Sequence, residues 1–320
     1  MESSPQPSQD FSAQSIRMDF PAIEAMQEAS EAVGWQCEYR QLDAGRLEAR
    51  TVLHEIDDFS FLRESANRRM NVVAESPAAT VTIIVPASDS IFGINGINVM
   101  HNTVAIVPEK TDISLFSEAG AGALSMHVPA DRFRDCLRAA SSGPVTSRLN
   151  GVQGFEPNAA TLHQLRRIII DGTSEVPAPA DQFGDKSTLE MIFIDLARSM
   201  LADGGNAEIL RKGHTREVLA RSLDYIDANL CAELRITDLC QVAGVSLSTL
   251  ERVFLGELRM TPLSYIRARR LDAVRRALIK GEPDTPIAQL AHDHGISHMG
   301  RFSADYRRQF GVLPSEDRPA

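Results

Sequence analysis

The sequence predicts an α+β protein, with an N-terminal barrel or sandwich of short β-strands and flanking helices, followed by an all-α domain with two helix-turn-helix units. Three observations lead to this fold class. Short β-branched runs broken by Gly, Asn, Asp and Pro fill residues 37–128. Amphipathic helical patterns follow them. Residues 235–310 then contain an imperfect internal repeat, which constrains the fold of that part.

The chain divides into four predicted parts, and its 320 residues suit two domains with separate cores. Residues 1–15 are rich in Ser, Pro and Gln and predict a disordered tail. Residues 16–140 hold the strands, whose number and spacing are typical of a sandwich or small barrel. Residues 141–210 predict a helical linker region, and residues 211–320 the all-α domain.

The repeat has a spacing of 51 residues and pairs Gly244 with Gly295 and Ser246 with Ser297. In each copy a short helix should end at the glycine, which supplies the positive φ of a tight turn, and the serine should cap a second helix. The expected caps of the two first helices are Thr237 and Thr285, the latter followed by Pro286.

Apolar residues recur at helical spacing in both copies and should form the buried faces of these helices. They are Leu239, Val242, Ala243, Leu250, Val253, Phe254 and Leu258 in the first copy, and Met299, Phe302, Tyr306 and Phe310 in the second.

One long helix is predicted between the copies, over residues 262–280. Thr261 is its expected cap, Pro262 takes its first position and Gly281 stops it. At 1.5 Å per residue it spans about 28 Å, so it can hold two helices near the ~34 Å repeat of B-DNA. A plain helical bundle with a solvated arginine face is the alternative, but it gives no reason for the repeat. The apolar stripe of the long helix is Leu263, Ile266, Leu271, Val274 and Leu278.

Residues 216–316 resemble the paired helix-turn-helix domain of AraC/XylS-type transcription regulators, through "ITDLCQVAGVSLSTLERVF", "TPLSYIRARRLDAVRRAL" and "IAQLAHDHGISHMGRFSADYRRQFGVLPSE". The sequence departs from the family at Ile296 and Leu313, neither of which faces DNA. The resemblance implies a cupin-like effector-binding barrel at the front and binding to double-stranded DNA. It also implies contact with RNA polymerase, a homodimer that forms through the 141–210 helices, and activation rather than repression. Packing of those helices against their own barrel is the alternative to dimerisation.

The buried positions of the predicted second helices leave polar positions facing outward, at the offsets where the family contacts bases. Arg252 can pair with guanine through two hydrogen bonds, and Glu251 can accept one from cytosine. The second unit offers fewer hydrogen-bonding groups, so Arg301 and phosphate contacts from Arg307 and Arg308 should matter more there, although a solvated face explains Arg307 and Arg308 equally well. The candidate DNA-binding residues are Ser248, Glu251, Arg252, Met299, Gly300, Arg301, Ser303 and Arg307.

Charge separates the two parts of the chain. Residues 211–320 carry 17 Lys and Arg against 14 Asp and Glu, a net of +3, whereas residues 1–210 carry 16 against 29, a net of −13. Only the C-terminal part is therefore suited to approach a polyanion. With no long apolar run and no signal-peptide pattern, we expect a cytoplasmic protein without membrane contact, whose four cysteines are reduced.

The strand-rich part contains no pattern that indicates catalysis. His54, His101 and His127 are isolated, with no H-x-H pair, and no nucleophile motif, phosphate loop or dinucleotide fingerprint is present. We therefore expect no metal, no cofactor and no enzyme activity. An enzyme that uses its C-terminal part only as a DNA tether is a less favoured alternative.

An arginine-rich stretch and a small-residue motif resemble the pattern with which PilZ-type domains hold cyclic di-GMP, because guanidinium groups pair with phosphates and guanine edges. The second motif departs from that pattern at Ser88, where Asp or Asn is usual, and arginines that pair with local carboxylates are an alternative. The effector is therefore expected to be cyclic di-GMP or a small metabolite, and control by a protein partner without a ligand remains open. The candidate ligand residues are Arg46, Arg50, Arg63, Arg68, Arg69, Ser88, Ser90 and Gly93.

Overall fold

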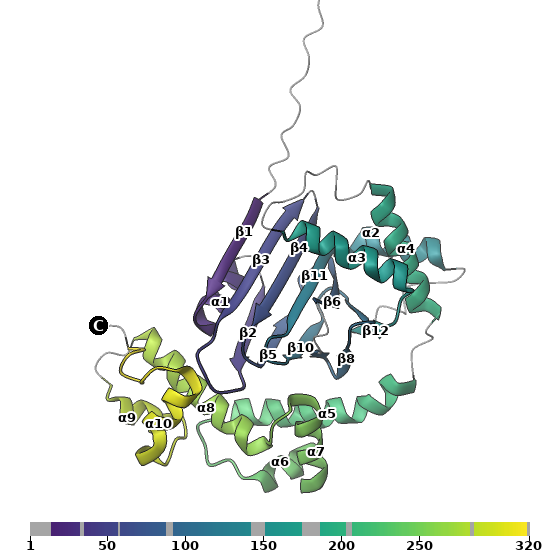
Figure 1. Cartoon of the computed structure of the whole chain (residues 1–320). Helices are drawn as coiled ribbons and strands as arrows, with labels where there is room; N and C mark the ends of the chain where they lie inside the picture. Colours follow the sequence, from purple (N-terminus) through teal and green to yellow (C-terminus); the bar gives the residue numbers. More distant parts are fainter. Residues whose placement is uncertain are drawn as a thin grey trace, which may run out of the picture.

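The computed structural model describes residues 14–32, 35–56, 58–87, 92–141, 151–174, 186–202, 207–281 and 285–318. Strands occupy the N-terminal part and helices the C-terminal part, which confirms the α+β class (Figure 1). The predicted tail over residues 1–15 lies almost wholly outside the described residues.

The strands form two antiparallel sheets that face each other. The larger sheet has the order β1 (Gln14–Phe20), β3 (Ala49–Ile56), β4 (Phe59–Ala66), β11 (Gly122–Pro129), β6 (Thr80–Pro86), β9 (Val104–Val107), β12 (Gln153–Phe155). The smaller sheet has the order β2 (Gln36–Gln41), β5 (Met70–Glu75), β10 (Asp112–Ser117), β7 (Phe92–Ile94), β8 (Ile97–Val99).

The predicted barrel is not closed. Within the described residues no strand of the larger sheet pairs with a strand of the smaller one, so each sheet keeps two edges and the arrangement is an open sandwich. Its interior contains apolar side chains from both sheets and from α1 (Ile23–Ala32), gathered in two clusters.

Three helices cover the outer face of the larger sheet: α2 (Ala130–Ala140), α3 (Ala159–Gly172) and α4 (Lys186–Ala202) (Figure 1). Alternation along each strand turns Phe61, Ile83 and Met126 toward these helices, where they join one large apolar core. The helices of the predicted linker region therefore pack on their own sheet, which is the alternative that the sequence left open.

The C-terminal part contains α5 (Ala207–Ala228), α6 (Ile236–Ala243), α7 (Leu247–Leu258), α8 (Pro262–Lys280), α9 (Ile287–Asp293) and α10 (Met299–Phe310). Its apolar residues form two cores that share α8. Tyr265 and Ile266 pack with α5, α6 and α7, whereas Leu271 and Val274 pack with α9 and α10. Helix α8 thus carries one helix pair at each end, as Figure 1 shows.

Helix α8 has the predicted boundaries because local signals set both ends. The Thr261 side chain accepts a hydrogen bond from the Ser264 amide, and Gly281 adopts a φ of 74°. Likewise, the Ser246 side chain caps α7 by accepting from the Thr249 amide.

The other three predicted caps are wrong. Helix α6 begins at Ile236, and its N-cap is Arg235, two residues before Thr237. The N-cap of α9 is Pro286 rather than Thr285. Helix α10 starts after His298, so Ser297 lies outside the cap position, and none of these three N-caps makes a side-chain hydrogen bond. Three positions of the predicted apolar faces are also exposed, Val242 at 41%, Leu263 at 63% and Met299 at 37%.

The turn between α9 and α10 requires glycine for two reasons. Gly295 has a φ of 78°, which L-residues with a side chain rarely adopt. A Cβ at this position would lie 2.8 Å from both the Leu230 carbonyl oxygen and the Arg270 Nε. Arg270 itself donates to the carbonyl oxygens of Leu230 and Ala232, so this turn packs against the end of α5.

Candidate functional site

The exposed side of α7 carries the first group of predicted DNA-binding residues. Leu250, Val253, Phe254 and Leu258 are buried in the core below the helix. The opposite positions, Ser248, Glu251 and Arg252, are all exposed.

The exposed side of α10 carries the second group. Phe302, Tyr306 and Phe310 face the core, with the rings of Tyr306 and Phe310 packed edge to face at 4.8 Å between centroids. Met299 was expected both in the buried stripe and among the outward positions, and its side chain is 37% exposed. The exposed residues of the predicted set are Met299, Gly300, Arg301, Ser303 and Arg307.

The arginines on these two faces differ in their neighbours. Among the ion pairs of the described residues, none involves Arg252, Arg301 or Arg307. Arg308 pairs with Asp305 at 2.6 Å, so part of its charge is already neutralised within α10. Three guanidinium groups on two helices are therefore available to phosphates or base edges.

A cavity of about 330 Å³ lies between the two sheets. Its walls come from the inner faces of both sheets and from α1, and apolar side chains such as Leu53, Leu62, Val72, Ile84 and Phe92 make up most of them. Cavities of this size, mostly apolar with a few polar groups, are typical of small-molecule sites. The sequence predicted a ligand in this part of the chain but identified none of the residues that line the cavity.

Three titratable side chains line the cavity from the larger sheet, Glu55 on β3, Glu64 on β4 and His127 on β11. Burial raises the pKa of Glu64 above its ordinary value, although hydrogen bonds from Tyr39 and Thr51 act in the opposite direction. Burial lowers the pKa of His127 to about 4, so the imidazole is neutral at pH 7. Its Nδ1 lies 3.0 Å from the Thr82 hydroxyl.

The arginines predicted to hold a ligand do not line this cavity. Strands alternate, and the cavity receives Thr51 and Leu53 from β3 and Leu62 and Glu64 from β4. Arg50 and Arg63 therefore lie on the opposite face of the larger sheet. Arg50 pairs with Asp19 at 2.5 Å.

The remaining predicted ligand residues lie elsewhere. The Arg68 guanidinium donates to the Arg46 carbonyl oxygen, and Arg69 pairs with Asp43 and donates to the Arg259 carbonyl oxygen. These three arginines thus belong to the edge that meets the C-terminal helices. Gly93 lies on β7 in the smaller sheet, and Ser88 and Ser90 lie outside the described residues.

The smaller sheet contacts the C-terminal helices through a partly buried group of charges that we call the interdomain ion network. Arg40, whose side chain is 5% exposed, donates to the Tyr265 hydroxyl and to Glu38 and Asp227, each at 2.7 Å. Arg269 pairs with Glu38 and Asp227 at 3.0 Å. Three arginines face three carboxylates, so the formal charges of the network balance. The network consists of Glu38, Arg40, Asp227, Arg269, Asp272 and Arg276.

Glu38 is the carboxylate of the network on β2. Burial alone would raise its pKa, but hydrogen bonds and charges from Arg40, Arg269 and Arg276 outweigh that effect and lower it to about 2. The neighbouring Gln41 and Gln309 add reciprocal bonds, each side-chain amide donating to the other residue's carbonyl oxygen at 2.8 and 3.1 Å.

Strand β2 connects the cavity with this network. Cys37 and Tyr39 point into the cavity, whereas Glu38 and Arg40, between and after them, point to α8. The Tyr39 hydroxyl lies 3.0 Å from the Ser30 hydroxyl of α1 and donates to Glu64. The two faces of β2 therefore join the lining of the cavity to the groups that contact α8.

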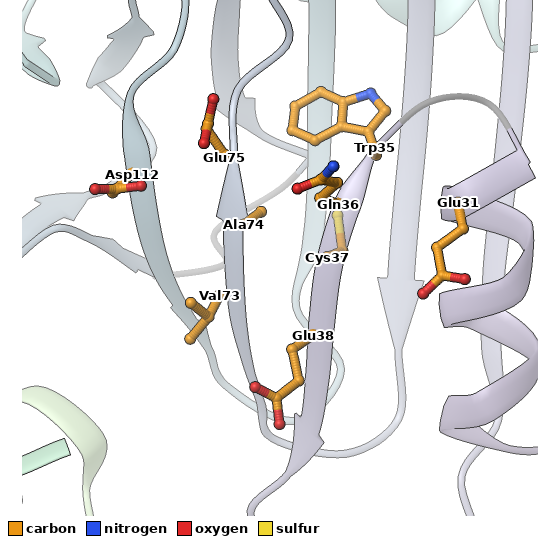
Figure 2. Close-up of a pocket in the computed structure, with 9 residues that line it drawn as sticks. All are labelled: Glu31, Trp35, Gln36, Cys37, Glu38, Val73, Ala74, Glu75 and Asp112. Carbon is orange, nitrogen blue, oxygen red and sulfur yellow. The ribbon is translucent and has the colours of Figure 1, made fainter. Parts of the chain in front are cut away.

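A second, more open hollow lies at the far end of β2 (Figure 2). Figure 2 shows Glu31 on α1, Glu38 on β2, and Glu75 and Asp112 on neighbouring strands. Glu75 and Asp112 are direct cross-strand partners.

Among the described residues, no group of three or more His, Cys, Asp or Glu side chains could hold a metal ion. No helix of the described residues is long and apolar enough to cross a membrane.

The comparisons with known proteins identify the C-terminal part. Residues 239–320 match a family model described as a helix-turn-helix domain. A XylDLEGF operon transcriptional activator 2 of Pseudomonas putida is 33% identical over 116 residues, which are 35% of this chain and 73% of the relative. A longer XylDLEGF operon transcriptional activator of that organism is 33% identical over 118 residues, which are 37% of this chain and 36% of the relative, so the match spans about a third of its length.

Among solved structures, the AraC-like transcriptional activator CuxR is 16% identical, with a TM-score of 0.40 over 81% of this chain and 94% of that one. The relatives are transcription regulators rather than enzymes. The match to the helix-turn-helix model and to most of the length of a XylDLEGF operon activator confirms the resemblance in the sequence: the chain belongs to the AraC/XylS-type family of transcription regulators.

Proposed function

We propose that this protein is a sequence-specific, DNA-binding transcription activator that works in the cytoplasm and is controlled by a small molecule bound between its two sheets. The exposed faces of α7 and α10 make the DNA contacts. The observation that carries this proposal is the pair of short helices α7 and α10, one at each end of α8, on which the exposed Arg252, Arg301 and Arg307 have no carboxylate partner among the described residues.

Each DNA-facing helix has a separate role. Arg252 and Glu251 of α7 read base edges in the first major groove, where a guanidinium recognises guanine and a carboxylate accepts from cytosine. Arg301 of α10 enters the second groove, and Arg307 contacts the phosphate backbone. The length of α8, about 28 Å at 1.5 Å per residue, suits two units that read the same face of a duplex.

The effector acts through β2. A ligand that contacts Tyr39 on the inner face of this strand shifts the position of Arg40 on its outer face, and Arg40 holds Tyr265 at the start of α8. The interdomain ion network has two arrangements in this account, and the ligand favours one of them, which alters how α7 and α10 are presented. Control by a protein partner without a ligand is the alternative, and the mostly apolar lining and size of the cavity favour a small molecule.

Two further parts of the proposal rest on family membership. The names of the relatives as activators favour contact with RNA polymerase. A homodimer is proposed on the same ground, with Ile170 of α3 and Met191 of α4 as exposed apolar side chains on the helical layer, at 40% and 62%. Sedimentation of the full chain tests the dimer.

Substitution of Arg252 by alanine tests the DNA face directly. The variant should lose about 1 to 3 kcal/mol of binding free energy on the preferred site, roughly a 5- to 150-fold weaker affinity, and should accept other bases at one position. The preferred site is first obtained by selection from random duplexes with the full chain, and affinities are then measured by fluorescence anisotropy at fixed salt.

Arg308→Ala is the matched control, because Arg308 is an exposed arginine already paired with Asp305. It should weaken binding to all DNA sequences to the same extent, and by less than Arg252→Ala weakens binding to the preferred site. If the Arg252→Ala variant and the unchanged chain bind the preferred DNA site with equal affinity, α7 is not part of the DNA interface.

A further inference from the structure

The lining of the cavity between the sheets has a charge pattern that restricts what it can hold. Among the described residues that line it there is no lysine or arginine, whereas two carboxylates, Glu55 and Glu64, are present. His127 lines the same wall of the cavity, on the neighbouring strand β11. It is neutral at pH 7 because burial lowers its pKa to about 4. A bound carboxylate or phosphate would meet no positive charge there, and its desolvation would not be offset.

Glu64 is the acceptor best placed for a ligand. It extends from the C-terminal half of β4 into the cavity and accepts a hydrogen bond of 3.4 Å from the Tyr39 hydroxyl, a distance longer than the usual range for a hydroxyl donor. One carboxylate can accept about four hydrogen bonds, so acceptor capacity remains after the contacts from Tyr39 and Thr51. Burial holds its pKa above the ordinary value, and a cation beside it would return it to the charged form.

The rest of the lining suits a compact apolar or aromatic body. Phe20, Met26, Leu62 and Phe92 supply apolar walls on both sheets and α1, and the Trp35 ring packs edge to face on His127 at 5.4 Å between centroids. Hydroxyl groups of Ser60, Ser125 and Thr82 are scattered along one wall. The volume of about 330 Å³ is at the lower end of the usual range for ligand pockets.

We propose that the effector of this protein is a small apolar or aromatic amine, whose ammonium group pairs with Glu64 between the two sheets. This inference rests on the proposed effector site and specifies its ligand class. It also departs from the cyclic di-GMP prediction, whose arginines lie on the outer face of the larger sheet or at the edge next to the C-terminal helices.

A matched series of probes tests the class. 4-Phenylbutylamine, 4-phenylbutanol and 4-phenylbutyrate share one apolar body and differ in their head group, which is cationic, neutral or anionic. Each is titrated into the full chain at pH 7 by calorimetry and by the fluorescence of Trp35, the single tryptophan, which lines the cavity. The amine should bind at least about tenfold more tightly than the carboxylate, because a charge-assisted hydrogen bond in a buried site is worth that much.

Glu64→Gln keeps the size of the side chain and removes its charge. It should weaken the affinity for 4-phenylbutylamine by about tenfold. The affinity for 4-phenylbutanol should change by no more than a few-fold. Glu48→Gln, an exposed carboxylate outside the cavity, is the control and should change neither. Should Glu64→Gln fail to fold, the ranking of the three probes on the unchanged chain still decides the matter.

Several results would overturn the amine proposal. These are tighter binding of the carboxylate, an amine affinity unaffected by Glu64→Gln, binding of cyclic di-GMP but of none of the three probes, or no binding of any of them. DNA affinity is measured on the same preparation, because a chain that binds DNA but no amine contradicts only this inference, whereas a chain that binds the amine but no DNA contradicts the proposed function.

Discussion

Replacement of Arg40 by methionine should lower the free energy of unfolding by about 3 kcal/mol. Removal of one member of a buried ion pair typically costs about 3 to 5 kcal/mol, because the remaining charge loses its partner. Glu38 and Asp227 keep contacts with Arg269 in the variant, which places the effect at the lower end of that range. Methionine fills a similar volume, so the lost charge rather than a cavity causes the change.

The measurement is urea unfolding followed by Trp35 fluorescence, since this residue directly precedes β2. Arg50→Met is the matched control. The Arg50 and Asp19 side chains are 50% and 62% exposed, and solvent screens such a pair, so its loss should change stability far less than the loss of Arg40 does. If both variants unfold at the same urea concentration, the contact between β2 and α8 does not hold the two parts of the chain together.

Leu250→Ala should also destabilise the protein, by about 2 to 5 kcal/mol, with the loss confined to the first helix pair. The Leu250 side chain is fully buried where α7 meets α5 and α6, so its truncation leaves a cavity beneath the proposed DNA-contacting helix. The DNA face of α7 is not altered chemically. DNA affinity should nevertheless fall, because α7 loses the core that orients it.

Leu255→Ala provides the comparison within the same helix. Leu255 is 47% exposed, so its truncation removes little buried surface and should change stability by less than about 1 kcal/mol. Thermal unfolding by calorimetry separates the two variants. Similar losses from both would mean that α7 does not present one face to the core and the other to solvent.

The helices of the C-terminal part could be predicted closely because their signals are local. Thr261, Pro262 and Gly281 lie within one turn of the ends that they set, and they gave the bounds of α8 correctly. Ser246 and Gly244 did the same for the turn between α6 and α7. Thr237, Thr285 and Ser297 misled the prediction because a cap residue is only one contribution to where a helix starts, and these three helices start without a side-chain cap.

The cavity could not be predicted, because its lining combines strands that are distant in sequence. Glu64 and His127 face the same space only after β4 pairs with β11, and nothing near either residue marks that pairing. The prediction of a closed barrel was wrong for a related reason. The spacing of short strands predicts how many strands there are but not which sheet edges pair.

The interdomain ion network had a weak signal in the sequence. Asp272 follows Arg269 by three residues in the arginine-rich α8, a spacing that brings the two side chains together on one helix face. The partners Glu38 and Arg40, more than two hundred residues earlier, gave no indication of this contact. The arginines of α8 could therefore be read as a solvated face, although Arg269 and Arg275 are buried.

The most direct test of the account is a hydroxyl-radical and methylation footprint of the full chain on its selected DNA site. We predict two protected major-groove segments about 10 base pairs apart on one face of the duplex. Arg252→Ala should weaken protection of one segment and Arg301→Ala that of the other. A single protected segment, or two segments that respond equally to both substitutions, would contradict the proposal that α7 and α10 each read one groove.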